Sequence, residues 1–234
     1  MTTQYNLVLL VLACLMGGAH AAGAARVDFA IGDVAAIQVD GTRRALTRGA
    51  EVRAGETVDT GGGRTQLRFS DGAMVSLQPQ TQFRIDAYEF KHESAGGERG
   101  FFSLLRGAMR TITGAIGKSD RKAYRLDTAV ATIGIRGTEY AVAYGSSITV
   151  TTNSGLIEVC NNAGCLLVEA GQSAYVPDAN TAPTFTRRRA LDPLGQSTGA
   201  PQPGFSSGDN PNIITPPAAP QAPPQAPPQG PDTY

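Results

Sequence analysis

Short alternations of apolar and polar residues, punctuated by glycine, are the feature that most constrains the fold of this chain. Leu67 and Phe69 alternate with polar residues, as do Val75 and Leu77. A period of two places every second side chain on the same face of a β-strand. Several such segments in succession, with turn residues about every 8–12 positions, are typical of sandwiches and rolls. We therefore expect an all-β fold, a single β-sandwich or β-roll of short antiparallel hairpins.

The turn between these two strands follows from their register. A two-residue Asp71-Gly72 loop would place Leu67 opposite a serine, whereas a three-residue loop pairs Leu67 with Val75 and keeps one apolar face. The last residue of a three-residue loop adopts the left-handed conformation that Gly72 favours. Gly107 is expected to form another turn. The remaining expected strands are 34–39, 45–48, 56–60, 82–91, 101–106, 108–112, 124–130, 138–144, 147–152, 155–160, 165–169 and 173–176.

A second hairpin is expected around the two downstream cysteines. If Cys160 lies opposite Cys165, then Val159 lies opposite Leu166 and the apolar residues pair with each other. Directly opposed strand residues have Cα atoms about 4.5–5.5 Å apart, which suits a disulfide. We predict a structural Cys160–Cys165 disulfide at the hairpin tip. The alternatives are free thiols, or a redox or metal site, which the five-residue spacing and the lack of a nearby histidine disfavour.

The N-terminus has the pattern of an export signal. Residues 7–16 form an unbroken apolar run, which is shorter than the roughly 20 residues of a membrane-spanning helix and suits a signal-peptide core. Ala19-His20-Ala21 supplies an A-x-A cleavage site. We expect a signal peptide over 1–21 and a periplasmic or secreted protein without a transmembrane span. The alternative is a lipoprotein that is anchored through a lipidated Cys14.

Composition divides the rest of the chain into a domain and a tail. Twelve of the fifteen prolines lie after residue 190, where Lys and Arg are absent. Such a segment buries too little apolar surface to offset the entropy of ordering. We expect one β domain over 27–176, followed by a linker and a disordered proline-rich tail over 177–234.

The charge balance and the histidine content argue against several function classes. The 20 basic and 20 acidic residues cancel, and no stripe of aromatic and basic residues indicates nucleic-acid binding. The basic cluster between 118 and 125 is expected to be a solvated loop, with contact to an acidic surface as the alternative. His92 stands alone in a loop, and Gly61-Gly62-Gly63 lacks the Lys of a phosphate-binding loop. We expect no enzyme, catalytic residue, cofactor or metal.

Five motifs occur in order along the expected domain. They are Gly32-Asp33-Val34, Gly55-Glu56-Thr57-Val58-Asp59-Thr60, Phe69-Ser70-Asp71-Gly72, Leu104-Leu105-Arg106-Gly107, and the segment from Thr128 to Val142, which contains Arg136-Gly137-Thr138. Together they resemble the FecR domain family over roughly 32–176. The resemblance implies an exported β-module. In regulatory members of that family the module follows a cytoplasmic helical domain and a membrane span, and relays a signal from an outer-membrane transporter to a sigma factor.

This sequence has the module without an anti-sigma part, so we expect an exported stand-alone FecR-domain protein. The expected function is a non-catalytic binding or interaction module of the cell envelope. Its partner would be an envelope protein or a polysaccharide such as peptidoglycan, and not nucleic acid. The alternative is an envelope-sensing component that acts in trans on a FecR-type sigma-factor pathway. The sequence does not indicate the ligand or the oligomeric state.

The motifs also supply the candidate residues for a structural or binding role. They are Thr60, Asp71, Gly72, Thr128, Arg136, Gly137 and Thr138. Arg136 has two interpretations because it lies between glycines in an apolar segment. A buried guanidinium would satisfy backbone carbonyls, with Glu139 as an ion partner. Alternatively, Arg136 and Thr138 would line a groove for an anionic or glycan ligand. The segment lies after the Asp71-Gly72 hairpin and before the Cys160–Cys165 tip. We therefore favour a structural role for it, as a crossing point of a β-roll.

Overall fold

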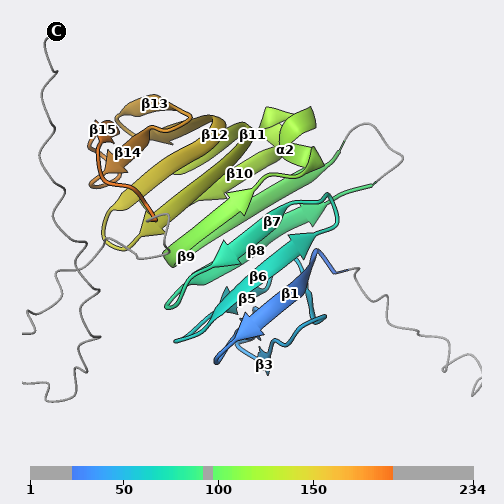
Figure 1. Ribbon diagram of the computed structural model, residues 1–234. Helices are drawn as coiled ribbons and strands as arrows, with labels where there is room; N and C mark the ends of the chain where they lie inside the picture. The colour runs from blue at the N-terminus through green and yellow to red at the C-terminus, as the bar shows by residue number, and fades with distance from the viewer. Residues whose placement is uncertain (1–22, 92–96, 192–234) are drawn as a thin grey trace, which may run out of the picture. The chain divides into compact units, whose positions relative to one another are not determined.

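The computed structural model describes residues 23–91 and 97–191 (Figure 1). The expected signal peptide with Cys14, the His92 loop and the chain from residue 192 lie outside these ranges. Within them the fold is β apart from one short helix and one 3-10 turn, which confirms the predicted class. The elements are β1 (Ala25–Ile31), β2 (Ala35–Ile37), β3 (Arg43–Ala45), β4 (Glu51–Val52), β5 (Thr57–Asp59), β6 (Arg64–Phe69), β7 (Met74–Leu77), β8 (Gln82–Glu89), β9 (Arg99–Ile112), α2 (Ala115–Ser119), η2 (Arg121–Ala123), β10 (Tyr124–Asp127), β11 (Thr132–Tyr144), β12 (Ile148–Asn161), β13 (Gly164–Glu169), β14 (Ser173–Val176) and β15 (Thr184–Thr186).

The sheet folds into two layers that share three long neighbouring strands, β9, β11 and β12 (Figure 1). The first half of β9 pairs with β8 and β10, and its second half pairs with β7 and β11. The first half of β12 pairs with β14 and its second half with β13. One layer therefore contains β13, β10, β8, β5, β2 and β3, the other contains β15, β14, β7, β6, β1 and β4, and the long strands belong to both. All pairs are antiparallel except β9 with β10.

Aromatic side chains join the two layers across a single core. Phe69 on β6 packs against Tyr88 on β8 and Phe102 on β9, with ring centroids 5.2 and 5.3 Å apart. The hydroxyls of Tyr124 on β10 and Tyr140 on β11 lie 2.7 Å apart in the interior. Burial raises the pKa of both phenols above the ordinary tyrosine value. Each aromatic pair contributes about 0.5–1.5 kcal/mol beyond its burial.

Each long strand changes its buried face at the point where it passes from one layer to the other. In β9 the buried residues are Phe102 and Leu104 before the change, and Met109 and Thr111 after it. Even-numbered positions thus give way to odd-numbered ones. In β11 the buried positions change from odd (Ile133, Ile135) to even (Tyr140, Val142). In β12 they change from even (Ile148, Val150) to odd (Ile157, Val159). A strand with period two can change its face only where an extra residue or a bend interrupts the ladder.

A glycine with positive φ occupies each of these three points. Gly107, Gly137 and Gly155 have φ values of 94°, 62° and 78°, which side-chain-bearing residues rarely adopt. A Cβ on Gly107 would overlap the Cα and hydroxyl of Thr81. One on Gly155 would lie 2.5 Å from the carbonyl oxygen of Gly137. All three strands therefore require glycine for the backbone conformation, and β9 and β12 require it for close packing as well.

Both hairpins derived from register are confirmed. Leu67 pairs with Val75, Phe69 donates its amide to the carbonyl of Ala73, and Gly72 has a φ of 85°. Cys160 lies opposite Cys165 in the second hairpin.

The expected turn at Gly107 is wrong, because the glycine bends one continuous strand rather than separating two. The expected strands 147–152 and 155–160 are likewise one strand, β12. The parallel pair and the short helix α2 were not expected. Strands β1, β4 and β15 lie outside the expected list, and β15 extends the sheet beyond residue 176.

Replacing Gly107 with Ala tests the role of the bends. The change imposes left-handed strain of about 1–2 kcal/mol and overpacking of about 1–3 kcal/mol. We expect the free energy of unfolding in urea to fall by about 2–4 kcal/mol. Gly134→Ala is the matched control, because it lies in β11 with no atom within 4 Å of the added Cβ and no positive φ. Equal stability of the two variants would contradict the proposed constraint.

Candidate functional site

The signature threonine Thr60 holds the bend of β9 in place. Its buried hydroxyl donates to the carbonyl of Gln78 at 2.8 Å and accepts the amide of Thr81 at 2.9 Å. The hydroxyl of Thr81 in turn accepts the amide of Ala108 and donates to its carbonyl, each at 3.0 Å. Ala108 follows Gly107 directly, so these two threonines fix the backbone immediately after the bend. The hydrogen-bonding capacity of Thr60 is used inside the fold.

The carboxylate of the neighbouring Asp59 has a structural role. Its carboxylate accepts the amide of Gly61 at 3.0 Å and pairs with Arg43 at 3.2 Å. Burial disfavours its charged form, but the hydrogen bonds from Gly61, Gln82 and Arg43 outweigh that effect and lower its pKa. Asp59 therefore stabilises the fold above the unfolded-state pKa, and this contribution is lost as the pH falls through the lowered value.

The signature Asp71 ties the first hairpin to helix α2. Its carboxylate accepts the amide of Ala73 at 3.1 Å, the hydroxyl of Tyr88 at 3.2 Å and the amide of Ile116 at 3.3 Å. Its backbone carbonyl accepts the amide of Ala115 at 2.9 Å. Burial, helped by the charge of Asp71, raises the pKa of Tyr88, which keeps the phenol a hydrogen-bond donor. All these contacts lie within the fold.

The signature Thr128 closes the turn between β10 and β11. Its hydroxyl accepts the amide of Ala131 at 3.0 Å and donates to the carbonyl of the same residue at 2.9 Å. Such a local turn is a common role for threonine.

The segment Arg136-Gly137-Thr138 forms the bulge at which β11 crosses between layers. Thr138 is 3% exposed, and its backbone exchanges two hydrogen bonds with Thr113, at 2.9 and 3.0 Å. The predicted crossing point is therefore confirmed.

The predicted environment of Arg136 is wrong. Its side chain is exposed, and the carboxylate of Glu139 pairs with Arg110 instead. Arg136 follows the buried Ile135 in a strand of period two, so its side chain points out of the core before the bulge at Gly137 is reached. Thr138 is too buried to line an open groove with Arg136. Its hydroxyl is the one buried side-chain polar atom in the described part of the chain without a hydrogen-bond partner.

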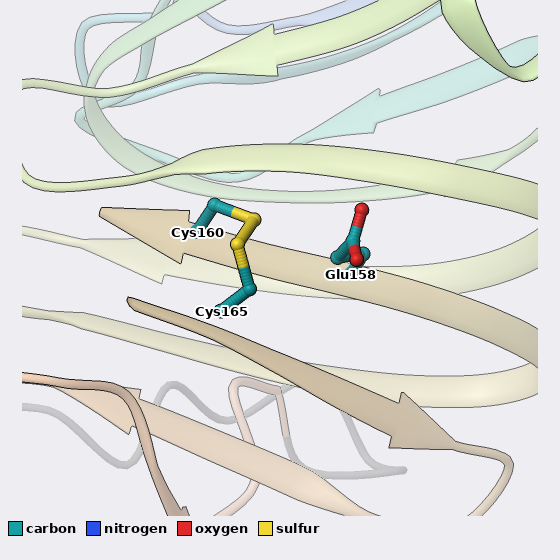
Figure 2. A group of neighbouring side chains, drawn as sticks. All are labelled: Glu158, Cys160 and Cys165. Atoms are coloured by element: carbon teal, nitrogen blue, oxygen red, sulfur yellow. A yellow bond between two sulfur atoms is a disulfide. The ribbon is translucent and has the colours of Figure 1, made fainter. Parts of the chain in front are cut away.

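The two downstream cysteines form the predicted disulfide, with Glu158 beside it on β12 (Figure 2). The sulfur and carboxylate atoms of the three residues lie within 4.8 Å of one another, a distance that would suit a metal ion. The sulfurs are bonded to each other, however, and only a thiolate is a good metal ligand. This group therefore fits a structural link between β12 and β13.

An open cleft of about 640 Å³ lies beside the bend of β9, on the layer that contains β14 and β15. Its floor is a row of residues that are paired on neighbouring strands: Ala108 with Ala143, Ala143 with Thr149, and Thr149 with Tyr175. The cleft is lined by Gln78, Pro79, Gln80, Gly107, Ala108, Ala143, Tyr144, Gly145, Ser146, Ser147, Thr149, Tyr175, Arg188, Arg189 and Ala190. A volume of this size is typical of small-ligand sites, which span about 300–1,000 Å³.

The cleft lining suits binding better than bond cleavage. It offers hydroxyls, amides, two phenols and two guanidinium groups, and it contains no His, Lys, Cys, Asp or Glu. A serine or threonine nucleophile needs a base within hydrogen-bond reach. Arginine does not provide one, because it stays protonated in proteins.

Sequence analysis did not identify this cleft. The lining comes from five separate segments, and Arg188 and Arg189 follow the expected end of the domain. The sequence did contain one indication of the cleft: Arg187-Arg188-Arg189 is a basic cluster, and no Lys or Arg follows it. No helix in residues 23–91 or 97–191 is long and apolar enough to cross a membrane.

Comparison with known families identifies the module. Residues 56–158 match the family described as FecR protein, so this stretch is a FecR domain, as its motifs predicted. The first motif, at Gly32, lies outside the matched region. No significant match was found among curated protein sequences.

Two crystal structures of a candidate anti-sigma factor from Parabacteroides distasonis have partly similar folds. Their sequence identities to this chain are 17% and 19%, and their TM-scores are 0.45 and 0.44. The matches cover 57% and 56% of this chain, and 60% and 58% of those chains.

Two signature residues should respond differently to mutation. Arg136→Ala removes an exposed side chain and should change the free energy of unfolding by less than about 0.5 kcal/mol. Thr60→Val leaves the carbonyl of Gln78 and the amide of Thr81 without their buried partner, so we expect a loss of about 1–3 kcal/mol. Thermal and urea unfolding of both variants measure the difference. A large loss for Arg136→Ala would restore a structural role for the guanidinium.

Removing the disulfide should lower stability modestly. Its loop is short, so the chain-entropy model gives about 2 kcal/mol for Cys160→Ser/Cys165→Ser. Urea unfolding of this double variant and of the oxidised wild type gives the difference, and peptide mapping without reductant checks the link. Free thiols in the protein purified from the periplasm would contradict the assignment.

Proposed function

We propose that this chain, whose residues 56–158 form a FecR domain, is a non-catalytic binding module of the bacterial cell envelope. The observation that carries the proposal is the separation of signature residues from the open cleft. Thr60, Asp71 and Thr128 use their polar side chains to hold bends and turns. The cleft is lined by polar groups of other residues, and its lining contains no side chain suited to general acid–base chemistry.

The sequence and the disulfide support an exported location. Residues 7–16 and the A-x-A motif fit a cleavable signal, and Cys160–Cys165 suits an oxidising compartment. Export would place the domain in the periplasm or outside the cell. A lipidated Cys14 would instead anchor it to a membrane.

The FecR domain favours a second candidate function. Because FecR modules in regulatory proteins relay envelope signals, this chain could act in trans as a sensor in a sigma-factor pathway. That role requires a protein partner in place of an envelope polymer.

Co-sedimentation with purified peptidoglycan sacculi tests the first candidate. The protein is purified from the periplasm of an expressing bacterium, and mass spectrometry of its N-terminus distinguishes cleavage after Ala21 from lipidation of Cys14. We expect the folded protein to pellet with sacculi and to stay in solution without them. Urea-unfolded protein, diluted into the same buffer, controls for trapping.

Absence of retention would overturn a direct role in binding the wall. If deletion of the gene then altered the activity of a sigma-factor reporter, the second candidate would be favoured. Retention without any change in the reporter would support the binding module.

A further inference from the structure

The second hairpin brings three potential metal-ligand atoms together on its exposed face (Figure 2). Glu158 and Cys160 are two residues apart on β12, so both side chains point to the same side while Val159 between them is buried. Cys165 lies directly opposite Cys160 on β13. One carboxylate oxygen and two sulfurs therefore converge within 4.8 Å of one another.

The pairing of β12 with β13 would keep the two sulfurs together without the disulfide. The ladder has six residue pairs, and the cysteines are only one of them. Ile157 and Val168 form another pair, and both are fully buried in the core. The cysteines are 5 residues apart in the sequence, so the disulfide closes a short loop and its loss removes a small share of a domain's stability. The reduced hairpin should therefore stay folded and hold two thiols face to face.

The carboxylate of Glu158 is available as a third ligand. Its side chain is exposed, and it forms no hydrogen bond or ion pair with the part of the chain that the structure describes. It is paired with Gly134 on β11 and Leu167 on β13, so neither neighbour supplies a cation. A Cβ on Gly134 would meet no atom within 4 Å, which leaves room beside Glu158 for a water molecule that completes a four-coordinate site.

We propose that reduction converts the Cys160–Cys165 link into a binding site for a thiophilic divalent cation such as Zn²⁺, with both thiolates and the Glu158 carboxylate as ligands. Directly opposed strand residues have Cβ atoms about 4.5–5.5 Å apart, from which two sulfurs can reach one ion at the usual Zn–S distance of about 2.3 Å. Mg²⁺ and Ca²⁺ are poorer fits because they prefer oxygen ligands. The site lies outside the cleft and does not depend on the proposed envelope-binding function.

Two chemical steps lead to the occupied site. A dithiol reductant transfers two electrons and two protons to the disulfide, so the S–S bond breaks, both cysteines become thiols and the two sulfurs of the reductant join in a new disulfide. Zn²⁺ then binds the two thiolates, and the thiol protons leave to solvent. Cys165 is exposed, so a reductant can reach its sulfur. The disulfide and the metal are thus alternative links between β12 and β13.

Metal titration of the full chain in two redox states tests the site. The protein from the periplasm is either left oxidised or reduced with a phosphine, which is then removed under argon. Competition with a chromophoric chelator measures Zn²⁺ binding, and Co²⁺ serves as a spectroscopic probe. We expect one ion per reduced chain, a thiolate-to-cobalt charge-transfer band, and binding to the oxidised chain that is weaker by about tenfold or more. Equal binding by both states, no binding by the reduced chain, or one ion shared by two chains would overturn the proposal.

Two carboxylate variants test the third ligand in the reduced chain. Glu158→Gln keeps the size of the side chain but removes its charge, and should raise the Kd for Zn²⁺ by about tenfold or more. Glu169→Gln is the matched control, because it changes an exposed glutamate of the same hairpin that lies outside the group of three, and it should leave the Kd unchanged. Equal Kd values for the two variants would reject Glu158 and, with it, the three-ligand site.

Thermal unfolding provides a second readout. Zn²⁺ should raise the melting temperature of the reduced chain, because an ion that binds only the folded state stabilises that state. The oxidised chain and the Cys160→Ser/Cys165→Ser variant should show no such rise. An equal rise in the double variant would place the ion elsewhere and reject the site. Circular dichroism of the reduced chain before zinc is added checks its fold, and an unfolded reduced chain would also overturn the proposal.

Discussion

The fold depends on one backbone constraint: three neighbouring strands must change their buried face as they pass from one layer to the other. A regular strand keeps its faces for its whole length, so continuous strands cannot serve two layers without an interruption. Glycine at 107, 137 and 155 provides that interruption, because the backbone at these positions has positive φ and two of the positions leave no room for a Cβ. The aromatic contacts between the layers, and the placement of α2 next to the first hairpin, follow from these bends.

This constraint explains what the signature residues do. Thr60 reaches the β9 bend through Thr81, and Thr138 meets Thr113 at the β11 bulge. Asp71 fixes the start of α2, which packs close to the same bulge. The motifs therefore describe how the chain crosses between layers. They identify the FecR domain without identifying its ligand, which has to be sought on surfaces that the motifs do not cover.

Sequence reasoning succeeded where local patterns decide the structure. The registers of both hairpins follow from the pairing of apolar residues, and this placed Cys160 opposite Cys165. It failed where distant segments decide. Gly107 has the local pattern of a turn residue, and only the packing of Thr81 against it keeps β9 continuous. Arg136 was expected in the core because its neighbours are apolar, but it alternates with the buried Ile135 and therefore faces solvent. The cleft combines five separate segments, which no local pattern brings together.

The sharing of β9, β11 and β12 also determines how the domain can come apart. Separating the layers would require these strands to break their ladders in both layers at once, since each belongs to both. Neither layer can therefore detach as an independent subdomain, and partial opening is confined to edge elements such as β3, β4 and β15. A protein built this way resists stepwise proteolysis of its interior.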